Sequence, residues 1–271
     1  MTTWTASLLT ALDEVLSSHP AAGAHPVGEQ LAWFFRDDDA GWADDRLLSV
    51  ARVFDGRGLS LDVAAIPTAV SGRLATALRS LTESRSVAVH QHGYAHVNHE
   101  NAGRRSEFGD TRAIEHQLRD LRSGRERLLG LLEGAVEPFF TPPWNRCADA
   151  TVSLLGELGI RVLSCDVSAR RREVPGVAEI PVTVDWARCS REGGRERLLE
   201  ELVHTVRWAG RTPIGVMLHH STMTDGEVAS LEELLEALAG HPAVDLTSMR
   251  ALARAEDGLP FSSGLEAASH G

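Results

Sequence analysis

Residues 31–39 read LAWFFRDDD, a short apolar run that ends in three consecutive aspartates. The run at 31–36 has the length and composition of a buried strand, and the carboxylates follow it directly. Similar runs recur along the chain and alternate with longer segments whose apolar residues return at helical spacing. This alternation predicts an α/β fold with a parallel sheet whose strands are joined by helices.

The expected strands are short and rich in β-branched residues, and they cover 31–36, 59–66, 86–92, 137–140, 160–165, 178–184, 213–219 and 244–246. The expected helices cover 44–54, 73–80, 111–132, 148–158, 195–208 and 227–239, and an amphipathic helix is expected within 1–20. A chain of 271 residues fits one large domain, although two smaller domains are an alternative. We expect a single domain over 1–255 and a flexible Gly-, Ser- and Ala-rich tail over 256–271.

Charge and cysteine usage restrict the partners and the compartment. The formal net charge of −11 disfavours binding to nucleic acid or to anionic membrane surfaces. Three cysteines without paired spacing predict neither a disulfide framework nor a cysteine zinc site, and they fit a reducing compartment. Because residues 1–20 lack the features of a signal peptide and no apolar run is long enough to span a membrane, we expect a cytoplasmic protein.

Polar residues cluster where the expected strands end. They are Asp37, Asp38 and Asp39, then His92 and His96, then the segment 142–146, then Asp166, and finally His219 and His220. In a parallel α/β sheet or barrel the carboxyl ends of the strands share one rim, which is where binding sites form. The sequence therefore predicts one site assembled from distant segments.

The first two groups have the chemistry of a metal site. Three adjacent carboxylates repel one another, and a bound cation relieves that repulsion. Residues 92–96 read HGYAH and place two imidazoles on one turn, where both can face the same ion. Each group also has a simpler interpretation: the aspartates as a solvated turn or helix cap, and the histidines as surface residues. His90 and His99 are alternative ligands or supporting residues.

Two further segments fit a pocket wall and a proton donor. Residues 140–146 read FTPPWNR, in which two prolines fix the backbone beside Trp144; packing of Trp144 on the core is the alternative. Residues 214–220 read IGVMLHH, an apolar strand that ends in two histidines. A histidine at that position can act as a general acid near neutral pH.

The order of these motifs resembles that of the polysaccharide deacetylase family (NodB-like, carbohydrate esterase family 4). The family motif Thr-Phe-Asp-Asp-Gly is similar to residues 36–40, which implies Asp38 as general base and Asp39 as metal ligand; a register shifted by one implies Asp37 and Asp38 instead. The motif His-Ser/Thr-x-x-His is matched at 92–96 with Gly93 at the second position, which implies His92 and His96 as metal ligands.

The remaining family motifs are matched in part. Aligning Arg-x-Pro-Tyr with residues 141–144 implies that the Trp144 N–H binds the oxyanion, and it leaves Thr141 at the arginine position. Arg36 and Arg146 are then the candidates to orient the catalytic aspartate. Asp166 resembles the aspartate of the fourth motif, whose Asp-Trp pair is replaced by residues 185–186. The last motif, Leu-x-x-His, matches 216–219 and implies His219 as general acid.

The resemblance covers residues 31–220 and implies a distorted (β/α) barrel of about seven parallel strands. It implies a metal-dependent amide hydrolase that removes an acetyl or other acyl group from an N-acylated sugar. The implied cofactor is one divalent ion, with zinc first and cobalt, nickel or manganese as alternatives, and the partner is a small molecule or oligosaccharide. Other functions left open are hydrolysis of a non-sugar amide or imide, and a non-catalytic carbohydrate-binding or regulatory role.

Overall fold

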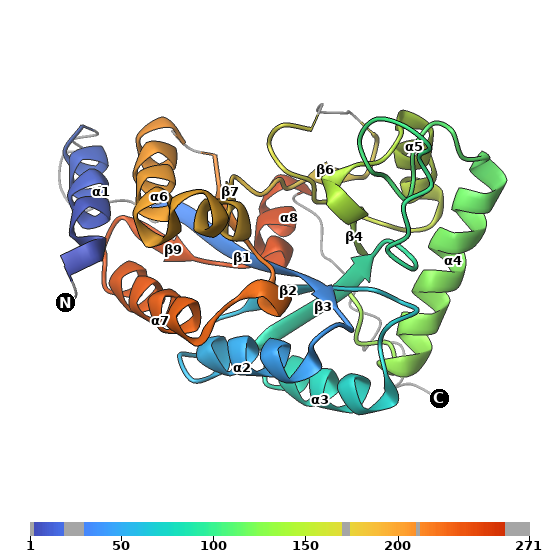
Figure 1. The fold of residues 1–271 in the computed structure, drawn as a ribbon, viewed down its shortest axis with the longest axis horizontal. Helices are drawn as coiled ribbons and strands as arrows, with labels where there is room; N and C mark the ends of the chain where they lie inside the picture. The colour runs from blue at the N-terminus through green and yellow to red at the C-terminus, as the bar shows by residue number, and fades with distance from the viewer. Residues whose placement is uncertain (1–2, 19–29, 170–173, 210–211, 258–271) are drawn as a thin grey trace.

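The computed structural model describes residues 3–18, 30–169, 174–209 and 212–257, and in these residues it contains nine strands in one sheet (Figure 1). The strands are β1 (Leu31–Ala40), β2 (Leu61–Ala65), β3 (Val87–His92), β4 (Phe139–Thr141), β5 (Val162–Leu163), β6 (Ala178–Glu179), β7 (Val184–Asp185), β8 (Ile214–Leu218) and β9 (Val244–Leu246).

Eight strands follow one path in the order β6-β5-β4-β3-β2-β1-β8-β7, and β9 pairs with β1 beside this path. All strand pairs along the path are parallel. The two strands at the ends of the path, β6 and β7, are consecutive in the chain and separated by residues 180–183. The sheet therefore curls back towards its own first edge, and the predicted distorted (β/α) barrel is confirmed.

Side chains alternate between the inside and the outside of the curled sheet, as the two-residue period of a strand requires. In β1, Trp33 and Phe35 belong to the main core beneath the helices. Phe34 lies in a separate inner cluster with Phe139 and Met217. The residues that follow Phe34 at two-residue intervals on β1, Arg36 and Asp38, are therefore inside the barrel.

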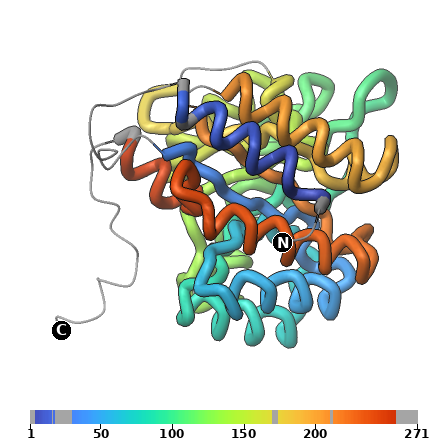
Figure 2. Tube along the Cα trace, turned by 90° about the vertical axis from the view of Figure 1, so that its left-hand side faces the viewer, coloured from blue at the N-terminus to red at the C-terminus, as the bar shows by residue number. Residues whose placement is uncertain are grey.

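The helices cover the outside of the sheet and are α1 (Ala6–Ser18), α2 (Asp44–Asp55), α3 (Gly72–Glu83), α4 (Ile114–Leu131), α5 (Asp149–Glu157), α6 (Trp186–Trp208), α7 (Asp225–Ala239) and α8 (Met249–Asp257). Figure 1 shows α2 and α3 along one side and α4 and α5 along another. Figure 2 shows α1 lying across the neighbouring helices of the last third of the chain, and α1 packs against α6. Helix α8 is different, because Met249 and Ala253 pack into the inner cluster and so close one end of the barrel.

Several expectations on the elements are corrected by the structure. Strand β1 runs to Ala40, so the three aspartates lie within the strand and not after it. The segment expected as one strand over 178–184 forms two short strands, because its ends pair with β5 and β8 on opposite edges of the sheet. Helix α6 begins nine residues before the expected start and bends at Gly193 and Gly194, and α8 was not expected at all.

Two other expectations concern the ends of the chain and membranes. Residues 258–271, most of the expected tail, lie outside the described residues. Among the described residues, no helix combines the length and the apolar composition needed to cross a lipid bilayer.

Candidate metal centre and adjoining cavity

Asp39, His92 and His96 converge at the carboxyl ends of β1 and β3, although more than 50 residues separate the aspartate from the histidines. Asp39 Oδ1 lies 3.2 Å from His92 Nε2 and 3.2 Å from His96 Nε2. One ligand atom from each residue falls within 4.8 Å of the other two. This set of two imidazoles and one carboxylate is the only such group found among the described residues.

The orientation of the His92 ring is fixed by a backbone contact on the side away from Asp39 and His96. Its Nδ1 lies 3.0 Å from the backbone oxygen of Thr141 on the adjacent strand β4. Since a carbonyl only accepts hydrogen bonds, Nδ1 carries a proton, and in the neutral imidazole the lone pair of Nε2 points towards Asp39 and His96. A backbone carbonyl behind a ligand imidazole is a common arrangement in metal sites.

His96 is held by the loop that follows β3. Glu107 is buried, and its carboxylate accepts hydrogen bonds from the backbone N–H groups of Tyr94 at 3.0 Å and Ala95 at 2.8 Å. Gly93 has a φ of +57°, and a Cβ at this position would lie 2.2 Å from Glu107 Oε2 and 2.5 Å from Pro143 Cγ. Only glycine fits there, which explains why this chain lacks the Ser or Thr of the related motif.

Left-handed backbone is concentrated at this site. Asp39, His96, Trp144 and Asn145 have φ values of 71°, 56°, 56° and 56°. Non-glycine residues in this region cost on the order of 1 kcal/mol or more each, and such strain clusters at functional sites. The register of β1 with β2 also shifts between Asp37 and Ala40, which turns the Asp39 side chain relative to its neighbours in the strand.

The electrostatics of the three side chains fit a divalent cation. Asp39 Oδ1 is buried and has no hydrogen-bond partner of acceptable geometry. Burial raises the pKa of Asp39, but the nearby imidazoles of His92 and His96 outweigh it and lower this pKa to about 2. Burial and the charge of His92 lower the pKa of His96 to about 4, so at neutral pH an ionised carboxylate faces a neutral imidazole.

His92 shows the opposite shift. Burial lowers its pKa, but Asp39 and Asp38 outweigh burial and raise the pKa above the ordinary value. Asp38 and Asp39 thus favour one positive charge at His92 Nε2, the ring nitrogen that faces Asp39. A cation ligated by Nε2 satisfies the same demand, and the donor set therefore fits a zinc-like metal.

Asp38 is held by Arg36 inside the barrel. Arg36 Nε lies 2.8 Å from Asp38 Oδ1 and Arg36 Nη2 lies 2.9 Å from Asp38 Oδ2, a bidentate pair with both side chains buried. The guanidinium also donates to the Ser164 backbone oxygen at 3.0 Å and to Asn145 Oδ1 at 2.7 Å. Burial by itself raises the pKa of Asp38, but the nearby cations, Arg36 foremost, keep it below the ordinary value.

Of the two arginines considered for orienting Asp38, Arg36 makes the contact. Arg146 instead donates to the backbone oxygen of Arg105 at 3.4 Å, and no hydrogen bond joins it to Asp38 in the described part of the chain. Thr141 stands at the position of the arginine in the family motif Arg-x-Pro-Tyr. It has a different partner, because its Oγ1 lies 2.8 Å from His90 Nε2. Of the alternative ligands, His90 is committed to Thr141, and His99 is exposed.

Asp37, the first of the three consecutive aspartates, faces away from the metal ligands. It is fully buried and hydrogen-bonded to His220 Nδ1, while His220 Nε2 lies 2.6 Å from the backbone oxygen of Trp42. Because both partners are acceptors, both ring nitrogens carry protons and the imidazole is charged. Burial lowers the pKa of His220, but the charge of Asp37 and the two hydrogen bonds outweigh it and raise this pKa to about 9.

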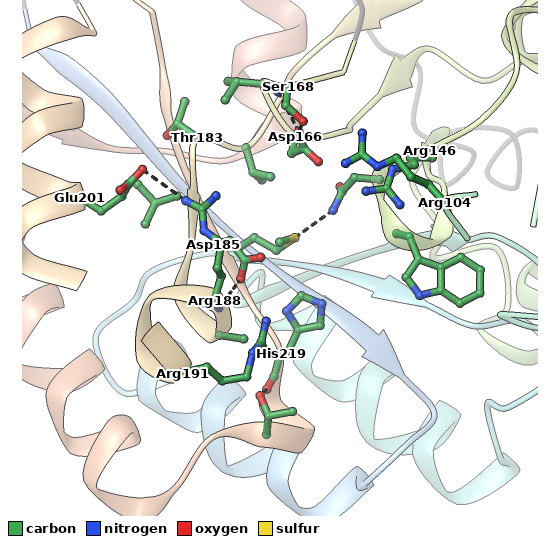
Figure 3. A pocket seen from close by; sticks show the side chains of 18 residues that line it. Arg104, Arg146, Asp166, Ser168, Thr183, Asp185, Arg188, Arg191, Glu201 and His219 are labelled. Atoms are coloured by element: carbon green, nitrogen blue, oxygen red, sulfur yellow. Dashed lines mark hydrogen bonds and ion pairs between the residues drawn. The ribbon is translucent and has the colours of Figure 1, made fainter. Parts of the chain in front are cut away.

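A cavity of about 470 Å³ opens beside the metal ligands, and the remaining expected site residues line it (Figure 3). Trp144 lies at its edge, with its ring centroid 4.4 Å from that of His96. His219, Arg146 and Asp166 also line the cavity. Of the pair at 185–186, Asp185 reaches the cavity, whereas Trp186 is buried in the main core.

Sequence inspection missed four residues that support the site: Glu107, Asn145, Ser164 and His220 as the partner of Asp37. Asn145 and His220 stood inside quoted motifs without an assigned function. Ser164 and Glu107 gave no signal, because their partners lie 128 and 12 or more residues away in the chain.

Comparison with solved structures identifies the fold, whereas comparison of the sequence finds no match. No family model matches the sequence, and no curated protein matches it either. Solved structures do match. A protein described as a polysaccharide deacetylase from Mycobacterium smegmatis has a TM-score of 0.68 and 15% sequence identity over 88% of this chain and 94% of that one.

Two other solved structures show the range of related proteins. An allantoinase has a TM-score of 0.64 and 14% identity over 88% of this chain and 93% of that one. A family 4 acetyl xylan esterase from Clostridium thermocellum, in complex with a cobalt ion, has a TM-score of 0.59 and 11% identity over 84% of this chain and 93% of that one. The chain therefore has the fold of the polysaccharide deacetylases and family 4 carbohydrate esterases.

Proposed function

We propose that this protein is a metal-dependent hydrolase that cleaves the amide bond of an N-acylated sugar. The observation that carries the proposal is the convergence of Asp39, His92 and His96 beside an ionised Asp38 held by a buried arginine. A buried carboxylate oxygen that faces two imidazoles supports a bound cation, and a cation beside an ionised base supports hydrolysis. The fold shared with deacetylases and esterases supports the same class of reaction.

The metal would be held by Asp39 Oδ1, His92 Nε2 and His96 Nε2. We propose zinc, because two histidines and one carboxylate are a typical catalytic zinc set, with cobalt, nickel and manganese as alternatives. When bound, such an ion polarises a carbonyl and makes a bound water more acidic. Hydrolysis then depends on what the side chains around it do with protons.

Asp38 is proposed as the general base. Its lowered pKa keeps it ionised at neutral pH, and the two hydrogen bonds from Arg36 leave it a single orientation. A base of this kind accepts a proton from the attacking water and contributes about 10²- to 10⁴-fold to the rate. Asn145, which also binds Arg36, connects this base to the loop that carries Trp144.

His219 is proposed as the general acid and the Trp144 N–H as a donor to the developing oxyanion. His219 directly follows β8, lines the cavity, and lies close enough to Asp38 and Asp39 to affect their pKa values. From there it can protonate a leaving amine that occupies the cavity. The Trp144 ring lies against the imidazole of His96, so this residue adjoins a metal ligand.

A second candidate is hydrolysis of a non-sugar amide or imide, which the likeness to an allantoinase favours. The two candidates share the metal, the base and the acid, and they differ in the group that fills the cavity. Incubation with N-acetylglucosamine oligomers and with cyclic ureides, followed by assays for acetate and for ring opening, separates them. We place either activity in the cytoplasm, where the three buried cysteines stay reduced.

The test of the proposal is metal analysis together with turnover in three variants. His92→Ala is expected to lose bound metal and activity together, and Asp38→Asn to keep the metal and lose turnover. His99→Ala, which removes an exposed histidine from the same loop, is the control and should change neither. Full metal content in His92→Ala, or full turnover in Asp38→Asn, would refute the assignment.

A further inference from the structure

The cavity beside the metal ligands carries more positive charge than the composition of the chain suggests. The whole chain has a formal net charge of −11, yet four arginines line this cavity: Arg104, Arg146, Arg188 and Arg191. Figure 3 shows Arg104 and Arg146 on one wall and Arg188 and Arg191 on the opposite side, near His219. A local excess of cations in an acidic protein attracts anions to that place alone.

Arg104 and Arg146 form a pair of like charges. They come from different loops, one after β3 and one after β4, and both reach the same wall of the cavity. Burial and the neighbouring Arg104 both lower the pKa of Arg146, and Asp166 opposes them only in part. Two guanidinium groups held side by side repel each other, and an anion placed between them removes that repulsion.

The carboxylates of the cavity already have partners within the protein. Asp166 Oδ1 accepts a hydrogen bond from the backbone N–H of Ser168 at 2.7 Å, and Asp185 Oδ1 accepts one from the backbone N–H of Arg188 at 2.9 Å. Glu201 binds Arg197 at 2.6 Å and Arg188 at 3.4 Å.

The cations are less well matched. Of the four cavity arginines, Arg188 is thus the one paired with a carboxylate. Arg104, Arg146 and Arg191 form no ion pair within the ranges that the structure describes. Among the described residues, no carboxylate competes with an anionic ligand for these three guanidinium groups.

We infer that the substrate carries an anionic group, a carboxylate or a phosphate, on its amine-bearing part, and that Arg104 and Arg146 bind this group. The inference rests on the proposed hydrolase function, because His219, the proposed acid, lines the same cavity. The part of the substrate that leaves with the amine then occupies this space. Bidentate recognition of a planar or tetrahedral anion is what arginine does better than lysine.

The experiment measures anion binding without catalysis. The full chain is stripped of metal with EDTA and titrated calorimetrically with inorganic phosphate and, separately, with succinate. Arg104→Gln and Arg146→Gln are compared with Arg73→Gln, an exposed arginine on α3 that does not line this cavity. Charge-assisted hydrogen bonds change affinity about 10- to 100-fold, so each cavity variant should weaken binding by that factor and Arg73→Gln should not.

A second measurement uses the metal-loaded protein and matched pairs of N-acetylated compounds, such as N-acetylglucosamine and its 6-phosphate. Arg146→Gln should raise KM for the charged member about tenfold or more and leave KM for the neutral member unchanged. If phosphate and succinate bind all variants equally, or bind none of them, the inference is overturned even if the protein is a hydrolase. Arginine-dependent anion binding without any hydrolysis upholds it and counts against the proposed function instead.

Discussion

Buried aspartates at the two ends of the barrel have pKa values that are shifted in opposite directions. At the carboxyl end of the strands, Asp38 and Asp39 have lowered pKa values and are charged. At the other end, Asp62 on β2 is fully buried, and burial raises its pKa to about 7 against a hydrogen bond from the Met249 N–H and the charges of Arg250 and Arg36. Asp62 accepts that hydrogen bond at 3.0 Å at the start of α8, the helix that closes this end.

The difference shows that partners, not burial, decide the charge of these carboxylates. Asp38 has a bidentate arginine and Asp39 has two imidazoles, whereas Asp62 has one backbone N–H and an Oδ1 without a partner. Asp38 and Asp62 are both fully buried, so the desolvation cost of these two carboxylates is similar. The carboxyl end of the strands keeps Asp38 and Asp39 ionised, and at the other end the Asp62 carboxyl group accepts a hydrogen bond from the first turn of α8.

The largest effect on this difference in pKa is expected when the partner of Asp38 is removed. In Arg36→Met, Asp38 becomes an unpaired buried carboxylate like Asp62, so its pKa should rise. Loss of one member of a buried pair costs about 3–5 kcal/mol in the free energy of unfolding, and loss of the ionised base should cost about 10²- to 10⁴-fold in kcat. Urea denaturation and a pH–rate profile measure both effects.

The double variant Arg36→Met, Asp38→Leu is the control for this experiment. It removes both charges, and its free energy of unfolding should recover relative to Arg36→Met alone. An Arg36→Met protein with an unchanged pH–rate profile would contradict the assigned pairing.

A second change perturbs the site end through its backbone. Gly93→Ser introduces the residue found in the related motif, but its Cβ would meet Glu107 and Pro143 at a φ of +57°. We expect a loss of about 2 kcal/mol or more in the free energy of unfolding and weaker metal binding. Gly130→Ser, in a helix with no atom within 4 Å of its Cβ position, is the matched control for a glycine substitution.

A third change tests whether Glu107 belongs with the well-partnered carboxylates. Glu107→Gln keeps one acceptor oxygen for the N–H groups of Tyr94 and Ala95 and loses the other together with the charge. Residues that hold a ligand loop typically alter metal affinity 10- to 100-fold, and we expect about tenfold weaker zinc binding here. Competition with a chromophoric chelator measures it, and unchanged affinity would remove Glu107 from the site.

The last change concerns the closed end of the barrel. Between pH 4 and 7 the folded state keeps a proton on Asp62 that the unfolded state has released, so the free energy of unfolding falls as pH rises through this window. The slope from one such group is at most about 1.4 kcal/mol per pH unit. Asp62→Asn should flatten it and be more stable than the parent protein at pH 7.5.

Urea denaturation of both proteins at pH 4.5, 6.0 and 7.5 checks the Asp62 prediction. The difference between the two proteins isolates Asp62 from the other titrating groups. A parent protein and a variant with parallel pH dependence would show that Asp62 is charged throughout.

Several features of this molecule could be predicted from the sequence because they depend on local pattern. The alternation of apolar runs and helical segments predicted a parallel α/β sheet, the family resemblance implied the distorted (β/α) barrel, and polar residues near the strand ends marked the rim of the site. The extent of β1 through the aspartates could not be predicted, because charged residues in a buried strand are stable only when distant partners are in place: His220 for Asp37, and Ser164 and Asn145 for the Arg36 that holds Asp38. Helix α8 was missed for a related reason: its packing surface lies inside a barrel closed by residues from the whole chain.

By itself, the sequence determined which chemistry is available: three adjacent carboxylates, two imidazoles four residues apart, and an apolar strand that ends in histidine. Only the tertiary structure decided which carboxylate does what, turning Asp37 towards His220, Asp38 towards Arg36 and Asp39 towards the paired imidazoles. Residue type sets what a side chain can bind. Its charge and orientation depend on atoms within a few ångströms, and in a barrel those atoms come from strands far apart in the chain.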